Sequence, residues 1–106
     1  MLPTIVKYQV AIKPVGEYAV AVPKALPDVA IGDTLQFSSS EEAFRVVFEN
    51  WPFKESETEV TTGDLLTFGR EGPFKFFCYV TPKGESKELA YAAGSGGNGN
   101  VKPPGK

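Results

Sequence analysis

The sequence lacks histidine altogether, since none of its 106 residues is one. Histidine is the commonest general base in enzymes, the commonest ligand of transition metals and the ordinary switch of charge near neutral pH. Whatever this chain does must therefore be done without an imidazole.

Other absences limit which partners and which cellular locations the sequence predicts. The single cysteine, Cys78, cannot form an internal disulfide, so cysteine usage leaves the redox compartment undetermined. No apolar run approaches the ~20 residues that span a bilayer, which predicts no membrane span. Residues 1–4 lack a charged region followed by an apolar run, so we expect no signal peptide. A net charge of -2 without a basic stripe predicts no nucleic-acid partner.

What is present is typical of one globular domain. Hydrophobic residues make up 42% of the chain and charged residues 23%, which is not the composition of a disordered chain. A chain of this length buries roughly two-thirds of its unfolded surface. We assign residues 1–93 to the domain. Residues 94–106, rich in glycine and proline, are predicted to form a flexible tail or a linker to another domain.

The strongest strand signal lies between Gly72-Pro73 and the turn residues that follow Val80. Most residues between these breaks are aromatic or β-branched, as in β-strands. The period of two predicts a core face that carries two phenylalanines, the thiol and a valine: Phe74, Phe76, Cys78 and Val80. Because the opposite face is largely aromatic too, we expect this strand to be central or covered on both sides.

The rest of the chain also favours short strands and shows no convincing helical periodicity. Expected strands lie at 4–12, 17–22, 31–37, 44–49, 55–62, 63–68 and 88–93. With the strand that holds Cys78, roughly seven or eight strands separated by turn signals predict an all-β fold, a Greek-key β-sandwich or barrel.

The pattern Gly-Asp-x-Leu-x-Phe occurs twice, at 32–37 and 63–68. Glycine permits an unusual turn dihedral, and aspartate can bond a nearby backbone amide. We therefore interpret Asp33 and Asp64 as turn residues before two similar strands and not as a catalytic carboxylate pair.

These segments resemble the cupredoxins, the small blue-copper sandwich proteins. In that family a Gly-Asp turn precedes a strand with the first copper-binding histidine, and a second such turn precedes an aromatic strand that ends in the cysteine ligand. Segment 72–78, GPFKFFC, fits the cysteine strand, and segment 44–48, FRVVF, fits the first-ligand strand. The resemblance covers roughly residues 25–90 and implies a cupredoxin-like fold.

The departures from the family decide what the resemblance implies about copper. Phe44 stands where the first histidine would be, Thr81 where the second would be, and the only methionine is Met1. A blue-copper site needs two imidazoles and a thiolate, and only Cys78 remains. We therefore expect no metal and no other cofactor, with Phe44, Cys78 and Thr81 as vestigial copper-site positions. Because cupredoxins are mostly exported, the resemblance favours a periplasmic or extracellular location.

Two further stretches are candidate binding sites for a partner or an ion. Trp51 and Phe53 flank Pro52 in an aromatic loop that we expect to cap one end of the sandwich, and they are also the best candidates in the sequence for partner-binding residues. Glu55, Glu57 and Glu59 share one face of an extended segment. They could bind calcium or a basic partner, but a solvated edge strand explains them better.

These observations favour a non-enzymatic, copper-free cupredoxin-like domain that acts as a binding or structural module. It would belong to a larger or envelope-associated protein, and its partner, a protein or a glycan, is not identified. The alternatives are an electron-transfer copper protein with a non-standard site at Cys78, an enzyme that uses Cys78 or carboxylates, and an immunoglobulin-like adhesion module. A free cysteine among phenylalanines is usually an inert apolar residue, which counts against the first two alternatives. The oligomeric state stays open.

Overall fold

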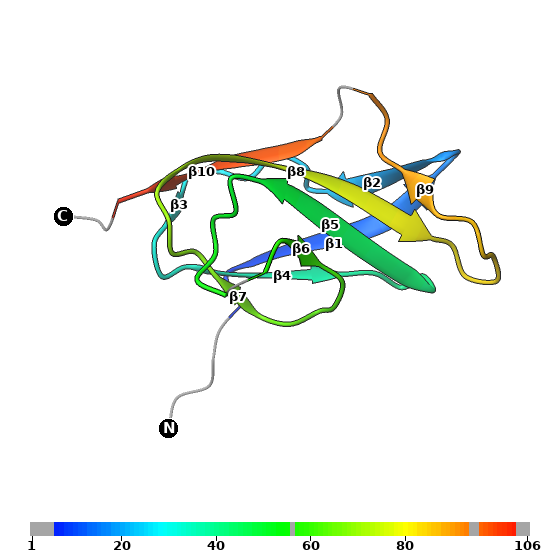
Figure 1. Cartoon of the computed structure of the whole chain (residues 1–106), viewed down its shortest axis with the longest axis horizontal. Helices are drawn as coiled ribbons and strands as arrows, with labels where there is room; N and C mark the ends of the chain where they lie inside the picture. The colour runs from blue at the N-terminus through cyan, green and yellow to red at the C-terminus, as the bar shows by residue number, and fades with distance from the viewer. Residues whose placement is uncertain (1–5, 56, 94–95, 104–106) are drawn as a thin grey trace.

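A computed structural model describes residues 6–55, 57–93 and 96–103, and these residues form two β-sheets without a helix (Figure 1). The two sheets comprise ten strands. Buried residues of both sheets belong to one hydrophobic core. The predicted all-β fold with sandwich-like layers is confirmed.

The first sheet has the strand order β2-β1-β4-β7. Its strands are β1 (Tyr8–Val15), β2 (Tyr18–Val22), β4 (Thr34–Ser38) and β7 (Leu66–Thr67). β1 and β2 form an antiparallel hairpin in which Val15 is paired with Tyr18, while β1 runs parallel to β4. Gly16 in the two-residue turn has φ +62°, a conformation that glycine adopts without steric penalty.

The second sheet has the order β3-β10-β8-β5-β6, with β9 paired to the end of β8. Its strands are β3 (Val29–Ala30), β5 (Ala43–Glu49), β6 (Glu59–Val60), β8 (Gly72–Thr81), β9 (Leu89–Ala90) and β10 (Gly97–Lys102). β8 is the strand predicted around Cys78. It lies between β5 and β10, so its predicted central position is confirmed.

The core is built on the inner side of β8, as the alternation predicts. Phe74, Phe76, Cys78 and Val80 are all buried. The Phe76 ring lies 5.7 Å from the ring of Phe37 on the first sheet, in an edge-to-face arrangement. Such aromatic pairs contribute roughly 0.5–1.5 kcal/mol beyond the area that they bury. The two sheets are thus joined by phenylalanines that alternate along their strands.

The prediction that residues 94–106 form a flexible tail is wrong for Gly97–Lys102. This segment is β10, antiparallel to β8 and parallel to β3 (Figure 1). A Cβ atom at Gly97 would collide with the Phe76 ring, and one at Gly99 would collide with the Phe74 ring. Glycine in this segment therefore leaves room for core rings and does not mark a linker. The remaining tail residues, 94–95 and 104–106, lie outside the described residues.

The repeated Gly-Asp segments meet in the first sheet, where β4 and β7 pair with each other. The leucine and phenylalanine of each copy are buried, as the pattern predicts. Asp33 is the turn residue expected, because its Oδ2 accepts a hydrogen bond of 2.9 Å from the Ala30 amide. Asp64 differs, since its carboxylate accepts a bond of 2.8 Å from the Thr62 hydroxyl.

The polar edge strand predicted at 55–62 is reduced to Glu59–Val60, which is β6. Conversely, β1 continues through Pro14 to Val15, beyond the end predicted at residue 12. Pro14 is compatible with the strand because the pairing of β1 with β4 ends at Ala11–Ser38, so one side of β1 is a sheet edge at Pro14.

Candidate binding surface

Two of the three positions that the resemblance assigns to a vestigial copper site, Phe44 and Cys78, are part of the packed core. Cys78 lies opposite Val46 of β5, and Phe44 lies opposite Val80. Phe44 packs against the core, and Cys78 is 5% exposed. Burial raises the pKa of the Cys78 thiol. The protonated thiol is therefore favoured, and it is a poor nucleophile and a poor ligand.

Thr81 does not join Phe44 and Cys78, contrary to the grouping that the sequence suggested. β8 extends through Thr81. Since Cys78 and Thr81 are three residues apart on one strand, their side chains point to opposite faces of the sheet. The described residues also contain no group of three or more histidine, cysteine, aspartate or glutamate side chains suited to holding a metal.

The aromatic loop at Trp51 and Phe53 caps one end of the sandwich. Phe53 is 5% exposed and lies 4.9 Å, ring to ring, from Phe68. Trp51 is half-buried against Phe48, and its indole N–H donates a hydrogen bond of 2.6 Å to the Glu55 carbonyl. Phe53 therefore has no free ring to offer a partner, and the binding role predicted for it is not supported by its burial.

The acidic stretch is partly used by the fold. The Glu55 carboxylate accepts a hydrogen bond of 3.0 Å from the Thr67 amide. The Glu59 carboxylate lies 3.7 Å from Arg45. Two of the three carboxylates thus have partners on different strands, as expected of a structural edge.

The outer side of the β1–β2 hairpin carries a surface that the sequence analysis did not identify. Three cross-strand pairs point away from the core there, and we call these six residues the hairpin face: Ala11–Val22, Lys13–Val20 and Val15–Tyr18. The exposed large hydrophobic residues of the described chain are all in this set, namely Val15 (52%), Tyr18 (50%) and Val22 (44%). The hairpin face is therefore an apolar surface turned toward solvent.

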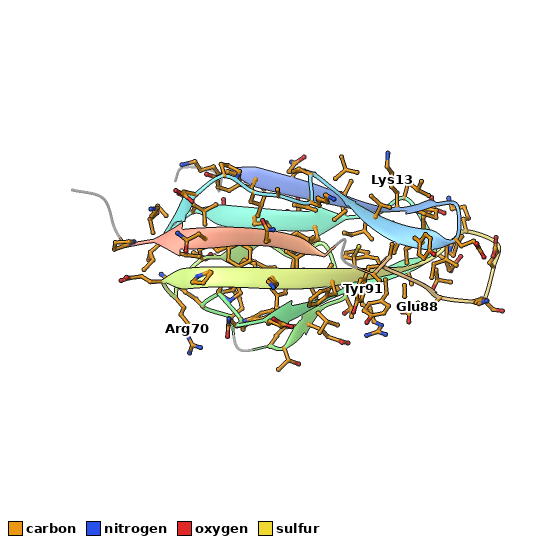
Figure 2. All side chains as sticks on the ribbon, turned by 90° about the horizontal axis from the view of Figure 1, so that it is seen from above. Lys13, Arg70, Glu88 and Tyr91 are labelled. Atoms are coloured by element: carbon orange, nitrogen blue, oxygen red, sulfur yellow. The ribbon has the colours of Figure 1, made fainter. Side chains whose placement is uncertain are left out.

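The hairpin face occupies only part of the outer side of the first sheet. The neighbouring strand β4 presents Thr34, Gln36 and Ser38 on that side. Lys13 is the only charged member of the hairpin face, and Figure 2 shows it pointing away from the body of the protein. The outer edge of β2 is partly closed by a bridge between Ala19 and Tyr91. The surface available to a partner is thus the face of the hairpin more than its edge.

A hollow adjoins the end of the hairpin. It has a volume of about 610 Å³ and lies between the hairpin turn at Gly16-Glu17 and the loop and short strand at 82–90. Its charged lining residues are Glu17, Glu85, Lys87 and Glu88. A second hollow of about 210 Å³ lies at Lys75, Phe77 and 96–98. Neither hollow reaches Phe44, Cys78 or Thr81.

The outer side of the second sheet is also aromatic, but the chain covers it. The Tyr91 ring lies 4.8 Å from the Phe77 ring and 5.7 Å from the Tyr79 ring. The Arg45 guanidinium lies 3.9 Å from the centre of the Tyr79 ring. Glu88 accepts two hydrogen bonds from Arg45, at 2.8 and 3.0 Å, and this interaction raises the pKa of the guanidinium. Figure 2 shows Glu88 and Tyr91 near each other, on the side away from Lys13.

Comparison with known proteins adds no family: the chain matches no family model and no curated protein. Within the described residues, no helix is long and apolar enough to cross a membrane.

Proposed function

We propose that this chain is a non-enzymatic, copper-free cupredoxin-like domain of Greek-key type, acting as a binding module whose contact surface is the hairpin face. The observation that carries the proposal is the gathering of the exposed large hydrophobic residues on one hairpin. Contiguous exposed apolar surface on a soluble domain is typical of an interaction site. The domain would belong to a larger or envelope-associated assembly.

The surroundings of Cys78 support the absence of copper chemistry. A blue-copper site needs imidazole nitrogens beside the thiolate, and the chain has no histidine. Phe44 and Val46 occupy the positions facing Val80 and Cys78, so hydrocarbon fills the neighbourhood of the sulfur. The same burial counts against an enzyme that uses Cys78 as a nucleophile.

Strand pairing bears on the immunoglobulin-like alternative. Immunoglobulin-type sandwiches are built from antiparallel sheets. Here β1 pairs with β4 in parallel, and β10 pairs with β3 in parallel. These two parallel pairs count against the adhesion module.

Copper titration tests the first half of the proposal. Cu²⁺ added to the reduced protein should produce no intense visible band, because no thiolate–imidazole site can form. A strong thiolate-to-copper band that saturates at one equivalent of copper would support the alternative of an electron-transfer copper protein.

Affinity capture from cells that make the protein tests the second half. Tyr18→Glu places a charge in the hairpin face, and Gln9→Glu places the same charge at an exposed polar position on the same side of β1. Proteins retained by the wild type should be lost with Tyr18→Glu and kept with Gln9→Glu, while both variants unfold at nearly the wild-type temperature. If no retained protein responds selectively to Tyr18→Glu, the hairpin face is not the contact surface.

A further inference from the structure

Building on the proposed function, we infer the chemistry of the partner: an amphipathic segment of another protein, whose apolar side chains cover the hairpin face and whose carboxylate pairs with Lys13. Three observations carry this inference, namely the position of Lys13, the absence of an acidic residue from the face, and the geometry that a second copy would need.

Lys13 lies at the centre of the hairpin face. Its cross-strand pair with Val20 is the middle one of three, with Ala11–Val22 on one side and Val15–Tyr18 on the other. Any surface that covers both outer pairs must therefore also cover the lysine. An ammonium group removed from water without a partner destabilises a complex strongly, and pairing with a carboxylate offsets that loss.

The carboxylate cannot come from the hairpin face itself. Its other five members are alanine, valine and tyrosine. The ion pairs of the described residues involve Lys7, Arg45 and Lys102 and leave Lys13 exposed. Since no ion pair of the described residues joins Lys13 to an acid, we expect the partner to supply the acid that neutralises Lys13 in a complex, and this preference gives the surface its specificity.

A second copy of the chain fits the hairpin face poorly. A two-fold axis along the strands would place Lys13 of each copy on Val20 of the other, so neither ammonium would meet an acid. An axis across the strands through the middle pair would bring the two Lys13 residues together. Pairing of the β2 edges is hindered by the bridge from Ala19 to Tyr91.

The size of the hairpin face suits one segment of secondary structure. Residues on the same side of a strand recur every ~6.8 Å, so three pairs span roughly 13 Å along two neighbouring strands. A helix is ~10 Å across and rises ~6 Å over four residues, so a helix of about three turns would cover the face. An anionic membrane is a poorer match, because membrane-binding faces carry several basic residues and this face carries one.

A displayed library of random peptides of about a dozen residues tests the inference, with selection on immobilised wild type, Lys13→Glu and Lys75→Glu. Lys75 is an exposed lysine on the other sheet and is the matched control. Binders whose retention requires Tyr18 should carry aspartate or glutamate between apolar residues when selected on wild type and on Lys75→Glu. Selection on Lys13→Glu should enrich lysine or arginine there instead. Replacing the acid of a selected peptide by its amide should weaken binding to wild type about five-fold.

The outcomes separate the inference from the function on which it rests. Tyr18-dependent binders without an acidic preference, or with one that Lys13→Glu leaves unchanged, overturn the partner chemistry and leave the hairpin face as a binding surface. The lack of any Tyr18-dependent binder overturns both. Tyr18-dependent sedimentation of the protein with vesicles of phosphatidylcholine and phosphatidylglycerol would show that the hairpin face binds a membrane and not a protein segment.

Discussion

Both sheets of the sandwich carry apolar side chains on their outer sides, and they differ in whether other residues of the chain cover them. On the second sheet, Phe77 and Tyr79 point outward from β8, and Tyr91 packs on both rings. The ion pair between Arg45 and Glu88 fixes the covering segment in place. On the first sheet, Val15 and Tyr18 point outward from the hairpin, and about half of each side chain stays exposed.

This difference indicates that outward apolar side chains are not by themselves a binding signal. A strand with two apolar sides is ordinary when the chain supplies its own cover, as Tyr91 does for β8. The hairpin has no such cover among the described residues, although the edge of its strand β2 touches Tyr91. What distinguishes the hairpin face is that no residue in the described part of the chain covers its apolar side chains.

The largest expected effect concerns β10, which pairs with β8 and leaves room for the core rings on the inner side of β8. Gly97→Ala should lower the free energy of unfolding by about 3 kcal/mol, because the added methyl would collide with the buried Phe76 ring. Asn98→Ala, one residue along and exposed, is the control and should change it by less than about 0.5 kcal/mol. Urea denaturation measures the free energy of unfolding of both variants. Equally small effects of the two substitutions would favour the predicted flexible tail over a packed strand.

The next prediction compares the two sides directly. Tyr91→Thr should cost about 2 kcal/mol, because it removes ring contacts with both Phe77 and Tyr79. Tyr18→Thr keeps a β-branched residue on the strand and should cost about 0.5 kcal/mol or less, since that ring is 50% exposed. Thermal and urea unfolding measure the loss of stability in the two variants. A larger loss for Tyr18→Thr than for Tyr91→Thr would contradict the comparison.

The buried inner side of β8 gives a pH-dependent prediction through Cys78. Its pKa in the folded protein is raised by burial, whereas an unfolded thiol ionises near pH ~8.5. The resulting stabilisation is complete below that pH and is lost as the pH rises toward the folded pKa, because only the unfolded chain releases the proton.

The measurement is the stability difference between wild type and Cys78→Ala, which should shrink between about pH 7 and about pH 10. A difference that stayed constant over this range would show that the thiol ionises equally in both states. In the same range, a thiol reagent should label native Cys78 far more slowly than the unfolded chain.

The smallest expected effect concerns the ion pair of the covered side. Glu88→Gln should lower stability by less than about 1 kcal/mol, because both side chains are partly exposed and solvent screens the pair. The loss should decrease further in about 1 M salt. Salt-dependent urea unfolding checks this, with Lys13→Gln as an exposed, unpaired control that should be insensitive to salt.

The sequence was sufficient for the all-β fold class because period-two alternation is strong where one side of a strand is buried. The inner residues of β8 and the burial of both Leu–Phe pairs follow from that pattern. The strand β10 did not follow, because a glycine that makes room for Phe74 or Phe76 looks like a linker glycine until the facing strand is known.

The sequence did not reveal the hairpin face for a different reason. The segment YAVAV of β2 is apolar on both sides, so alternation alone cannot say which side faces solvent. The proline in β1 also suggested an early strand end, which concealed the pairing of Val15 with Tyr18. Thr81 was grouped with Cys78 because the resemblance to cupredoxins assigns it the position of the second histidine. The strand β8 continues through Thr81, so its side chain points to the side of the sheet opposite to Cys78.

The most direct test of the uncovered hairpin face is photocrosslinking inside the cells that make the protein, with a photoreactive amino acid in place of Tyr18 or in place of Gln36. Light should join position 18 to one defined protein and leave position 36 without a product. Products of equal yield from both positions, or none from position 18, would contradict the account.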